Sequence, residues 1–267
     1  MIAADRPDSS LVCLRAHQLD RQRAFRRQRQ AQLPVVGEDH QVTDPHPWNT
    51  VDLADPPTRW PAGLDGLHLV HVPLAPEIRL YLATDAIVFW ARMESEAGKA
   101  LAAPFWASAW LGGQALARYI LDHPGVVAGR RVLDVAAGSG VAGIAAGLAG
   151  AAAVTANDID PYAIAAIEVN ATVNAVEVAV SCVTMLDEDV NVDVVLAGDV
   201  LYSKSMAETA IPFLERASAR GAQVLVGDPG RADMPRGRLE ILATYWAAHA
   251  AALTDAEVER VHVLRLP

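Results

Sequence analysis

The chain has 267 residues, of which 52% are hydrophobic, so it can bury a sizeable core. Its two cysteines, Cys13 and Cys182, cannot form a disulfide scaffold, and we expect a reducing, cytoplasmic setting. The formal net charge of −10 argues against a nucleic-acid partner, because binding to phosphates relies on basic residues. Neither an HExxH nor a paired CxxC motif occurs, so we expect no metal site.

Residues 1–66 differ in composition from the rest. The first 33 residues carry seven arginines and three aspartates, so the remainder of the chain has a net charge of −14. Prolines punctuate "DPHPWNTVDLADPPTRWPAG" and interrupt helices and sheet ladders. We therefore expect an irregular or disordered N-terminal segment over residues 1–66, although an Arg-rich start also resembles an organellar transit peptide. A folded domain over residues 67–267 follows.

From residue 70 onward the pattern is regular. "EIRLYLAT" alternates like a strand, and "PFWASAWLGGQALARYILDHP" predicts a helix that ends before Pro124. Strands are then predicted at 131–136, 152–157, 178–183, 192–197, 222–227 and 258–265, and helices at 141–149, 161–174, 204–218 and 236–248. This alternation predicts a Rossmann-like α/β fold with helices on both faces of a parallel sheet.

One uncharged stretch, Val135–Ala156, is long enough to cross a bilayer. It is rich in weakly hydrophobic alanine and glycine and is flanked by Asp134 and Asp158. A strand, a tight turn and a buried helix explain it better, so we expect no membrane partner.

Gly138-x-Gly140-x-x-Gly143 is a glycine turn between a predicted strand and helix. Such a turn lets backbone amides approach either a nicotinamide dinucleotide or S-adenosylmethionine. Asp134 favours S-adenosylmethionine, because its carboxylate would repel a pyrophosphate and attract a sulfonium and an α-amino group. Asp158 ends the next strand and can accept hydrogen bonds from ribose hydroxyls, which both cofactors possess.

Further cofactor contacts are expected from neighbouring positions. Ile159 could lie against the adenine face, "TMLDED" offers Met185 and Leu186 for packing, and Asp187 could bind the adenine amino group. Trp106 is predicted to wall the pocket, whereas Trp110 is expected in the core. Asp160 is expected to cap the following helix. The predicted cofactor-binding set is therefore Trp106, Asp134, Gly138, Gly140, Asp158, Ile159, Met185, Leu186 and Asp187.

Ligands of open α/β sheets bind beyond the carboxyl ends of the strands. There, "VVLAGDVLYS" contributes Asp199 and Tyr202, and "VLVGDPGR" contributes Asp228. We predict these three as the catalytic residues, because two carboxylates and a tyrosine suit an amine acceptor that must lose a proton. A local DPG turn is an equally good explanation of Asp228.

With these motifs together, the chain resembles class I, seven-stranded methyltransferases. Within them it is similar to the electron transfer flavoprotein β-subunit lysine methyltransferase family, through "RVLDVAAGSGVAGIAA", "ANDIDPYAIAAIEVN", "DVVLAGDVLYS" and "VLVGDPGRADMP". The resemblance covers roughly residues 70–267 and implies a methyltransferase domain that uses S-adenosylmethionine. It also implies that Gly138, Gly140 and Asp158 contact the cofactor and that Asp199 and Tyr202 line the lysine pocket. The β-subunit of electron transfer flavoprotein is then the expected protein substrate.

Three alternatives stay open. The first is an N-methyltransferase for a small amine or heterocycle such as nicotinamide. The second is an NAD-dependent oxidoreductase, against which Asp134 and the lack of a Tyr-x-x-x-Lys motif argue. The third is a non-catalytic scaffold, which the intact set of acidic and glycine residues disfavours.

Overall fold

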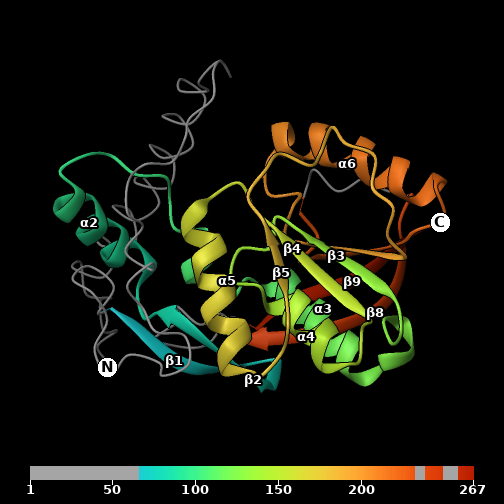
Figure 1. The fold of residues 1–267 in the computed structure, drawn as a ribbon, viewed down its shortest axis with the longest axis horizontal. Helices are drawn as coiled ribbons and strands as arrows, with labels where there is room; N and C mark the ends of the chain where they lie inside the picture. The colour runs from blue at the N-terminus through green and yellow to red at the C-terminus, as the bar shows by residue number, and fades with distance from the viewer. Residues whose placement is uncertain (1–65, 232–237, 249–257) are drawn as a thin grey trace, which may run out of the picture. The chain divides into compact units, whose positions relative to one another are not determined.

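A computed structural model describes residues 66–231, 238–248 and 258–267, all within one unit, His46–Pro267. The predicted N-terminal segment lies outside the described residues except for Gly66. The main sheet comprises β3 (Arg131–Val135), β4 (Ala153–Asn157), β5 (Ala179–Ser181), β6 (Val194–Gly198), β7 (Gln223–Asp228), β8 (Glu240–Ala248) and β9 (Val258–Leu266). Its strand order is β5-β4-β3-β6-β7-β9-β8, and β9 runs antiparallel to both of its neighbours (Figure 1). The predicted Rossmann-like, seven-stranded sheet is confirmed.

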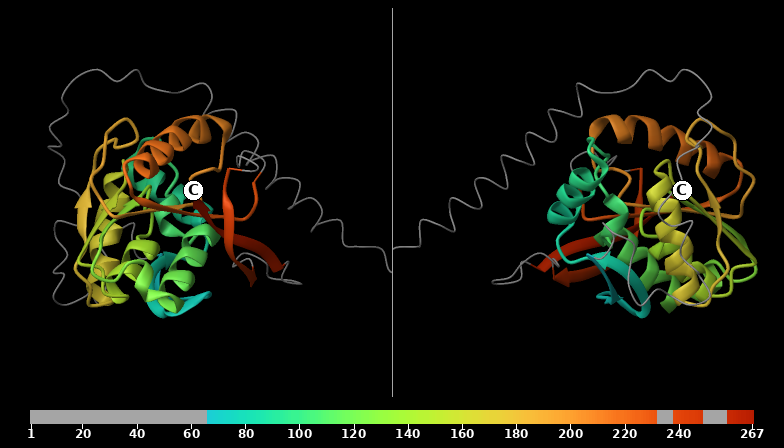
Figure 2. Two further views of the ribbon diagram at one scale, coloured as in Figure 1. Left: turned by 90° about the vertical axis from the view of Figure 1, so that its right-hand side faces the viewer. Right: turned by 60° about the vertical axis from the view of Figure 1, so that its left-hand side comes forward.

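Strand β6 shows why the sheet is covered on both faces. Val194 and Leu196 pack in a core with α3 (Leu111–Asp122) and α4 (Val141–Leu148). Val195 and Ala197 point the other way, into a core with α6 (Lys204–Ala219). Successive side chains of a strand face opposite sides, so an unbroken apolar run requires helices on both. Figures 1 and 2 show α6 on one side of the sheet and α3 and α4 on the other.

A third core forms beside this sheet. It joins α5 (Pro161–Val173) to α2 (Ala86–Ala97) and to the short 3₁₀ helix η2 (Phe105–Ala107). Within it, the Trp106 ring packs edge-on against Phe89 at 5.7 Å and stacks on Tyr162 at 6.3 Å. The third core therefore anchors the segment that leads into α3.

A two-stranded hairpin, β1 (Leu67–Val72) and β2 (Ala75–Ala83), is fastened to α5 by asparagine side chains. Asn174 Oδ1 accepts from the Arg79 N–H at 2.9 Å, and its Nδ2 donates to the Arg79 carbonyl at 2.6 Å. Asn170 Oδ1 accepts from the Tyr81 N–H at 2.8 Å, while its Nδ2 donates to the Ser139 carbonyl at 3.0 Å. One side chain thus links the hairpin to the glycine loop.

Two predicted helices are wrong in part or whole. The helix predicted at 236–248 is strand β8, because the β-branched and aromatic residues of "EILATYW" pair with β9. The continuous helix predicted from Pro104 is interrupted, since Trp110 has an extended backbone (φ −72°, ψ 150°) and α3 starts after it. The apolar stretch after Asp134 is β3, a turn, α4 and β4, as expected. Across the described residues, every helix is too short or too polar to cross a membrane.

Candidate functional site

The glycine loop joins β3 to α4. Gly138 and Gly140 have φ values of 55° and 80°, a region that glycine enters without strain. The Ala137 N–H donates to the Asn157 carbonyl at 2.9 Å, and the Gly138 N–H donates to Asp158 Oδ2 at 2.9 Å. The loop is therefore held against the end of β4. An ideal Cβ on Gly138 would meet Trp106 Cα only at 3.9 Å, so the main chain there is open to a ligand.

Asp134 lies beneath this loop. Its side chain is buried, and Oδ2 accepts from the Gly143 N–H at 2.7 Å, at the start of α4. Burial raises the pKa of Asp134 to about 7. Asp134 therefore supports the start of α4 from within the core.

Asp158 organises the loop from the end of β4. Besides Gly138, the Asp160 N–H donates to it, to Oδ1 at 3.0 Å, and burial raises its pKa. Each carboxylate oxygen has two lone pairs, so both can still accept from ribose hydroxyls. Next to it Ile159 is 70% exposed, an apolar surface available to a base. Asp160 caps α5 by accepting from the Tyr162 N–H at 2.9 Å, as predicted.

The other predicted cofactor residues lie around this centre. The main chain of Trp106 borders Gly138, although its ring is buried in the third core. Asn157 Nδ2 donates to the carbonyls of Ser181 and Val183, which ties the loop after β5 to the end of β4. On that loop Met185 and Leu186 are half-buried against the α6 core, and Asp187 is exposed.

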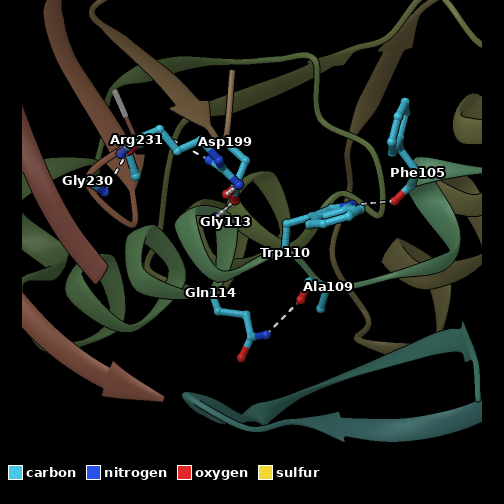
Figure 3. A network of polar contacts seen from close by, with 9 residues as sticks. Phe105, Ala109, Trp110, Gly113, Gln114, Asp199, Gly230 and Arg231 are labelled. Atoms are coloured by element: carbon cyan, nitrogen blue, oxygen red, sulfur yellow. Dashed lines mark hydrogen bonds and ion pairs between the residues drawn. The ribbon is translucent and has the colours of Figure 1, made fainter. Parts of the chain in front are cut away.

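Helix α3 crosses the carboxyl ends of β6 and β7 at main-chain contact. A Cβ on Gly112 would lie 2.1 Å from the Gly227 carbonyl oxygen, and one on Gly227 would lie 2.0 Å from that of Gly112. A Cβ on Gly198 would lie 2.9 Å from the Gly113 nitrogen and Cα, and the Gly113 N–H donates to Asp199 Oδ2 at 3.1 Å (Figure 3). We call this contact between α3 and the ends of β6 and β7 the glycine crossing.

Asp199 and Asp228 are bridged by Arg231. Arg231 Nη2 lies 2.8 Å from Asp199 Oδ1, and Nη1 lies 3.0 Å from Asp228 Oδ2. Asp228 is fully buried, and its Oδ1 accepts from the N–H groups of Gly230 and Arg231, both at 2.7 Å. Asp228 thus caps its own turn behind Arg231, whereas Asp199 keeps a small exposed fraction.

Asp199 combines burial with an incompletely satisfied carboxylate. It is 8% exposed, and burial raises its pKa while Arg231 opposes that rise. Its φ of 57° is left-handed, a conformation that aspartate tolerates better than most residues. Among the described residues, Oδ1 has no hydrogen bond of good geometry, although Arg231 pairs with it by charge. The carboxylate is therefore held by the Gly113 N–H through Oδ2 and by the charge of Arg231 through Oδ1.

Three exposed aromatic side chains, Phe105, Trp110 and Tyr202, form a cluster that we call the aromatic trio. The Phe105 ring lies 5.9 Å from each of the other two, and Trp110 Nε1 donates to the Phe105 carbonyl at 2.8 Å. Figure 3 shows Trp110 between Phe105 and the Asp199–Arg231 pair. The expectation that Trp110 lies in the core is wrong: it is 41% exposed, because it precedes the buried stretch of α3.

Sequence reasoning gave no role to Phe105 or Arg231. Aromatic residues flanking a glycine pair, and a basic residue closing "GDPGR", were the available signals. Only the fold brings 105, 199 and 231 together.

Comparisons with known proteins show which methyltransferases this chain is similar to. Residues 114–220 match the family model of the ribosomal protein L11 methyltransferase, PrmA. The electron transfer flavoprotein beta subunit lysine methyltransferase of Danio rerio is 44% identical over 163 residues, 60% of this chain and 62% of that protein. The homolog of Caenorhabditis elegans is 34% identical over 189 residues, 64% of this chain and 76% of that protein. Among solved structures, the magnesium protoporphyrin IX methyltransferase of Synechocystis PCC 6803 has a TM-score of 0.45 at 17% identity, over 58% of this chain and 78% of that one.

Strand order and glycine loop together define a seven-stranded α/β methyltransferase fold. The chain belongs to the electron transfer flavoprotein β-subunit lysine methyltransferase family, given its coverage of the Caenorhabditis elegans relative. Its match spans 62% of the length of the Danio rerio protein. The predicted cofactor, S-adenosylmethionine, is confirmed by this membership in a methyltransferase family.

Proposed function

We propose that this protein is an S-adenosylmethionine-dependent protein-lysine N-methyltransferase whose substrate is the β-subunit of electron transfer flavoprotein. The observation that carries the proposal is Asp199, a buried carboxylate at the end of β6 that lies beside the aromatic trio (Figure 3). Its Oδ1 pairs with Arg231 by charge but has no hydrogen bond of good geometry among the described residues. A lysine side chain has the matching chemistry, because its aliphatic stem suits aromatic walls and its amine suits a carboxylate. The names of the family's relatives support a protein substrate.

We assign the cofactor site to the glycine loop and the ends of β4 and β5. Gly138 and Gly140 allow the main chain to approach the ligand, and Asp158 holds the ribose hydroxyls. Ile159, Met185 and Leu186 offer apolar contacts to the adenine, and Asp187 is placed to accept from its amino group. Trp106 borders the loop, and Asp134 supports it from below. When bound, S-adenosylmethionine supplies a methyl group attached to a positively charged sulfur.

The acceptor side has a different task. Methyl transfer is an in-line displacement: the amine nitrogen bonds to the methyl carbon as the carbon–sulfur bond breaks, and the nitrogen sheds a proton. Positioning supplies much of the rate of such a reaction. Asp199 Oδ1 orients the nitrogen and draws off its proton, Tyr202 and the rest of the trio enclose the lysine stem, and Asp228 holds Arg231 in place.

The test is methylation of purified flavoprotein with a labelled methyl donor, followed by mass spectrometry of the labelled peptide. A parallel reaction contains nicotinamide and other small amines instead. We expect label on a lysine of the β-subunit. If only the small amines gain label, the small-molecule N-methyltransferase is the right assignment and the protein substrate is wrong.

The cofactor site is tested by calorimetry with S-adenosylhomocysteine. Asp158→Ala should weaken binding by roughly 1.5–3 kcal/mol, the usual value for hydrogen bonds to a charged group. Gly138→Arg should abolish it, because the side chain would fill the space beside Trp106. Unchanged affinity in both variants would place the cofactor elsewhere. A cytoplasmic location stays a prediction from cysteine content.

A further inference from the structure

Arg231 is the one charged side chain that touches both carboxylates at the acceptor side among the described residues. It pairs with Asp199 at the end of β6 and with Asp228 at the end of β7, at 2.8 and 3.0 Å. Its side chain is 26% exposed, so the guanidinium reaches the surface where an acceptor would enter. Arg231 therefore belongs to the acceptor side of the site. The roles proposed for Asp199 and Tyr202 do not yet explain what Arg231 does there.

The other ionisable groups around this pair do not replace it. His262 on β9 is the sheet partner of Asp228 on β7 and shares a 2.9 Å hydrogen bond with Thr244, and burial and Arg260 lower its pKa. A lowered pKa disfavours the charged imidazolium. Tyr202 follows Asp199 on the loop, and α3 contributes its N-terminal main chain at Gly113. Arg231 supplies the positive charge next to Asp199.

An acidic acceptor site presents a chemical difficulty. A carboxylate next to a lysine stabilises the ammonium form, which has no lone pair for the methyl group. A guanidinium within hydrogen-bond distance of that carboxylate cancels much of its attraction and repels a second cation. The same guanidinium keeps the buried carboxylate ionised, so that it can still orient the amine and receive a proton.

Resting on the proposed function, we propose that Arg231 is a positioning residue that keeps Asp199 ionised and the acceptor amine neutral. Asp228 contributes by fixing the guanidinium through the Gly230–Arg231 turn. An ionised Asp199 and a neutral acceptor amine both favour turnover. Without the cation, Asp199 and the acceptor amine would each hold a proton up to a higher pH.

The experiment is the pH dependence of kcat/KM for wild type, Arg231→Gln and Arg231→Lys. We expect the acidic limb of the kcat/KM profile of Arg231→Gln to move to higher pH by about one unit. This shift corresponds to a roughly tenfold lower kcat/KM at neutral pH, and the difference from wild type should become smaller at alkaline pH. Arg231→Lys retains the charge and should stay near wild type. Arg265→Gln, which removes an exposed ion pair with Glu240 at a distant edge, is the matched control and should keep the wild-type profile.

Equal loss for Arg231→Gln at every pH, or an unmoved profile, would overturn the inference. The affinity of each variant for S-adenosylhomocysteine shows whether it is folded. If Arg231→Gln does not fold, the double variant Asp228→Asn/Arg231→Gln is measured instead, because it also removes the buried charge of Asp228 that Arg231→Gln leaves unpaired. Carboxyl carbon NMR supplies a readout without turnover: the Asp199 pKa should rise in Arg231→Gln, and an unchanged pKa also overturns the inference. Failure of wild type to methylate flavoprotein would instead refute the proposed function. The NMR measurement of the Asp199 pKa would then still test whether Arg231 keeps Asp199 ionised.

Discussion

Asp199 accepts a hydrogen bond from Gly113 of the glycine crossing and lies near Trp110 of the aromatic trio (Figure 3). Replacing it with alanine removes the oxygen that meets the acceptor but leaves the glycine loop and Asp158 in place. We expect Asp199→Ala to lower methyl transfer about 100-fold or more, as for loss of a proton acceptor, with S-adenosylhomocysteine affinity nearly unchanged. Asp193→Asn is the control, since Asp193 precedes the same strand and pairs with exposed Arg131. Loss of cofactor binding in Asp199→Ala would assign this carboxylate to the cofactor instead.

Asp134 gives the protein a specific pH response. Burial raises its pKa from 3.8 in the unfolded chain to about 7, so the folded state binds a proton more tightly. Its contribution to stability is then fully present below pH 4 and is lost as the pH rises through 7. Asp134→Asn retains an oxygen for the Gly143 N–H without this titration. Between pH 6 and pH 8.5, denaturant unfolding should show wild type losing about 1 kcal/mol relative to Asp134→Asn; a constant difference would contradict the burial of this charge.

At the scale of elements, the glycine crossing fixes α3 against β6 and β7. A methyl group on Gly112 would overlap the Gly227 carbonyl, which is main chain and cannot rotate away. Gly112→Ala should therefore cost about 3 kcal/mol or more in free energy of unfolding, and should lower activity by displacing Asp199. Gly125→Ala is the matched control, because nothing lies within 4 Å of its Cβ position. Equal stability of the two variants would mean that α3 packs less closely than described.

The elements also show how far sequence reasoning reaches. Strands β6 and β7 are predictable because a buried parallel strand contains an unbroken apolar run, here "VVLA" and "VLV". Strand β8 is not, because its partner β9 lies beyond residues 249–257 and local periodicity does not reveal that pairing. Similarly, Asp199 could be placed at a strand end, but its pairing with Arg231 requires two loops that only the sheet brings together. The exposure of Trp110 likewise depends on where α3 starts.

At the scale of the whole molecule, the described sheet, its helices and the glycine loop all lie after residue 65. We predict that residues 1–66 are dispensable for cofactor binding, because their proline content and charge disfavour a packed core. A chain that starts near Leu67 should bind S-adenosylhomocysteine as the full chain does. Calorimetry of the two chains measures this, with circular dichroism as the check on folding. Unfolding of the shortened chain would show that the first 66 residues are integral to the domain.

The glycine crossing has an evolutionary consequence. It holds the acceptor side through main-chain atoms, so the positions that admit no larger residue are Gly112, Gly198 and Gly227. The three side chains of the aromatic trio do not take part in this main-chain contact and are partly exposed, so they can be exchanged without disturbing it. After gene duplication, substitutions that change the acceptor preference should therefore accumulate at positions 105, 110 and 202, while Gly112, Gly198 and Gly227 stay invariant.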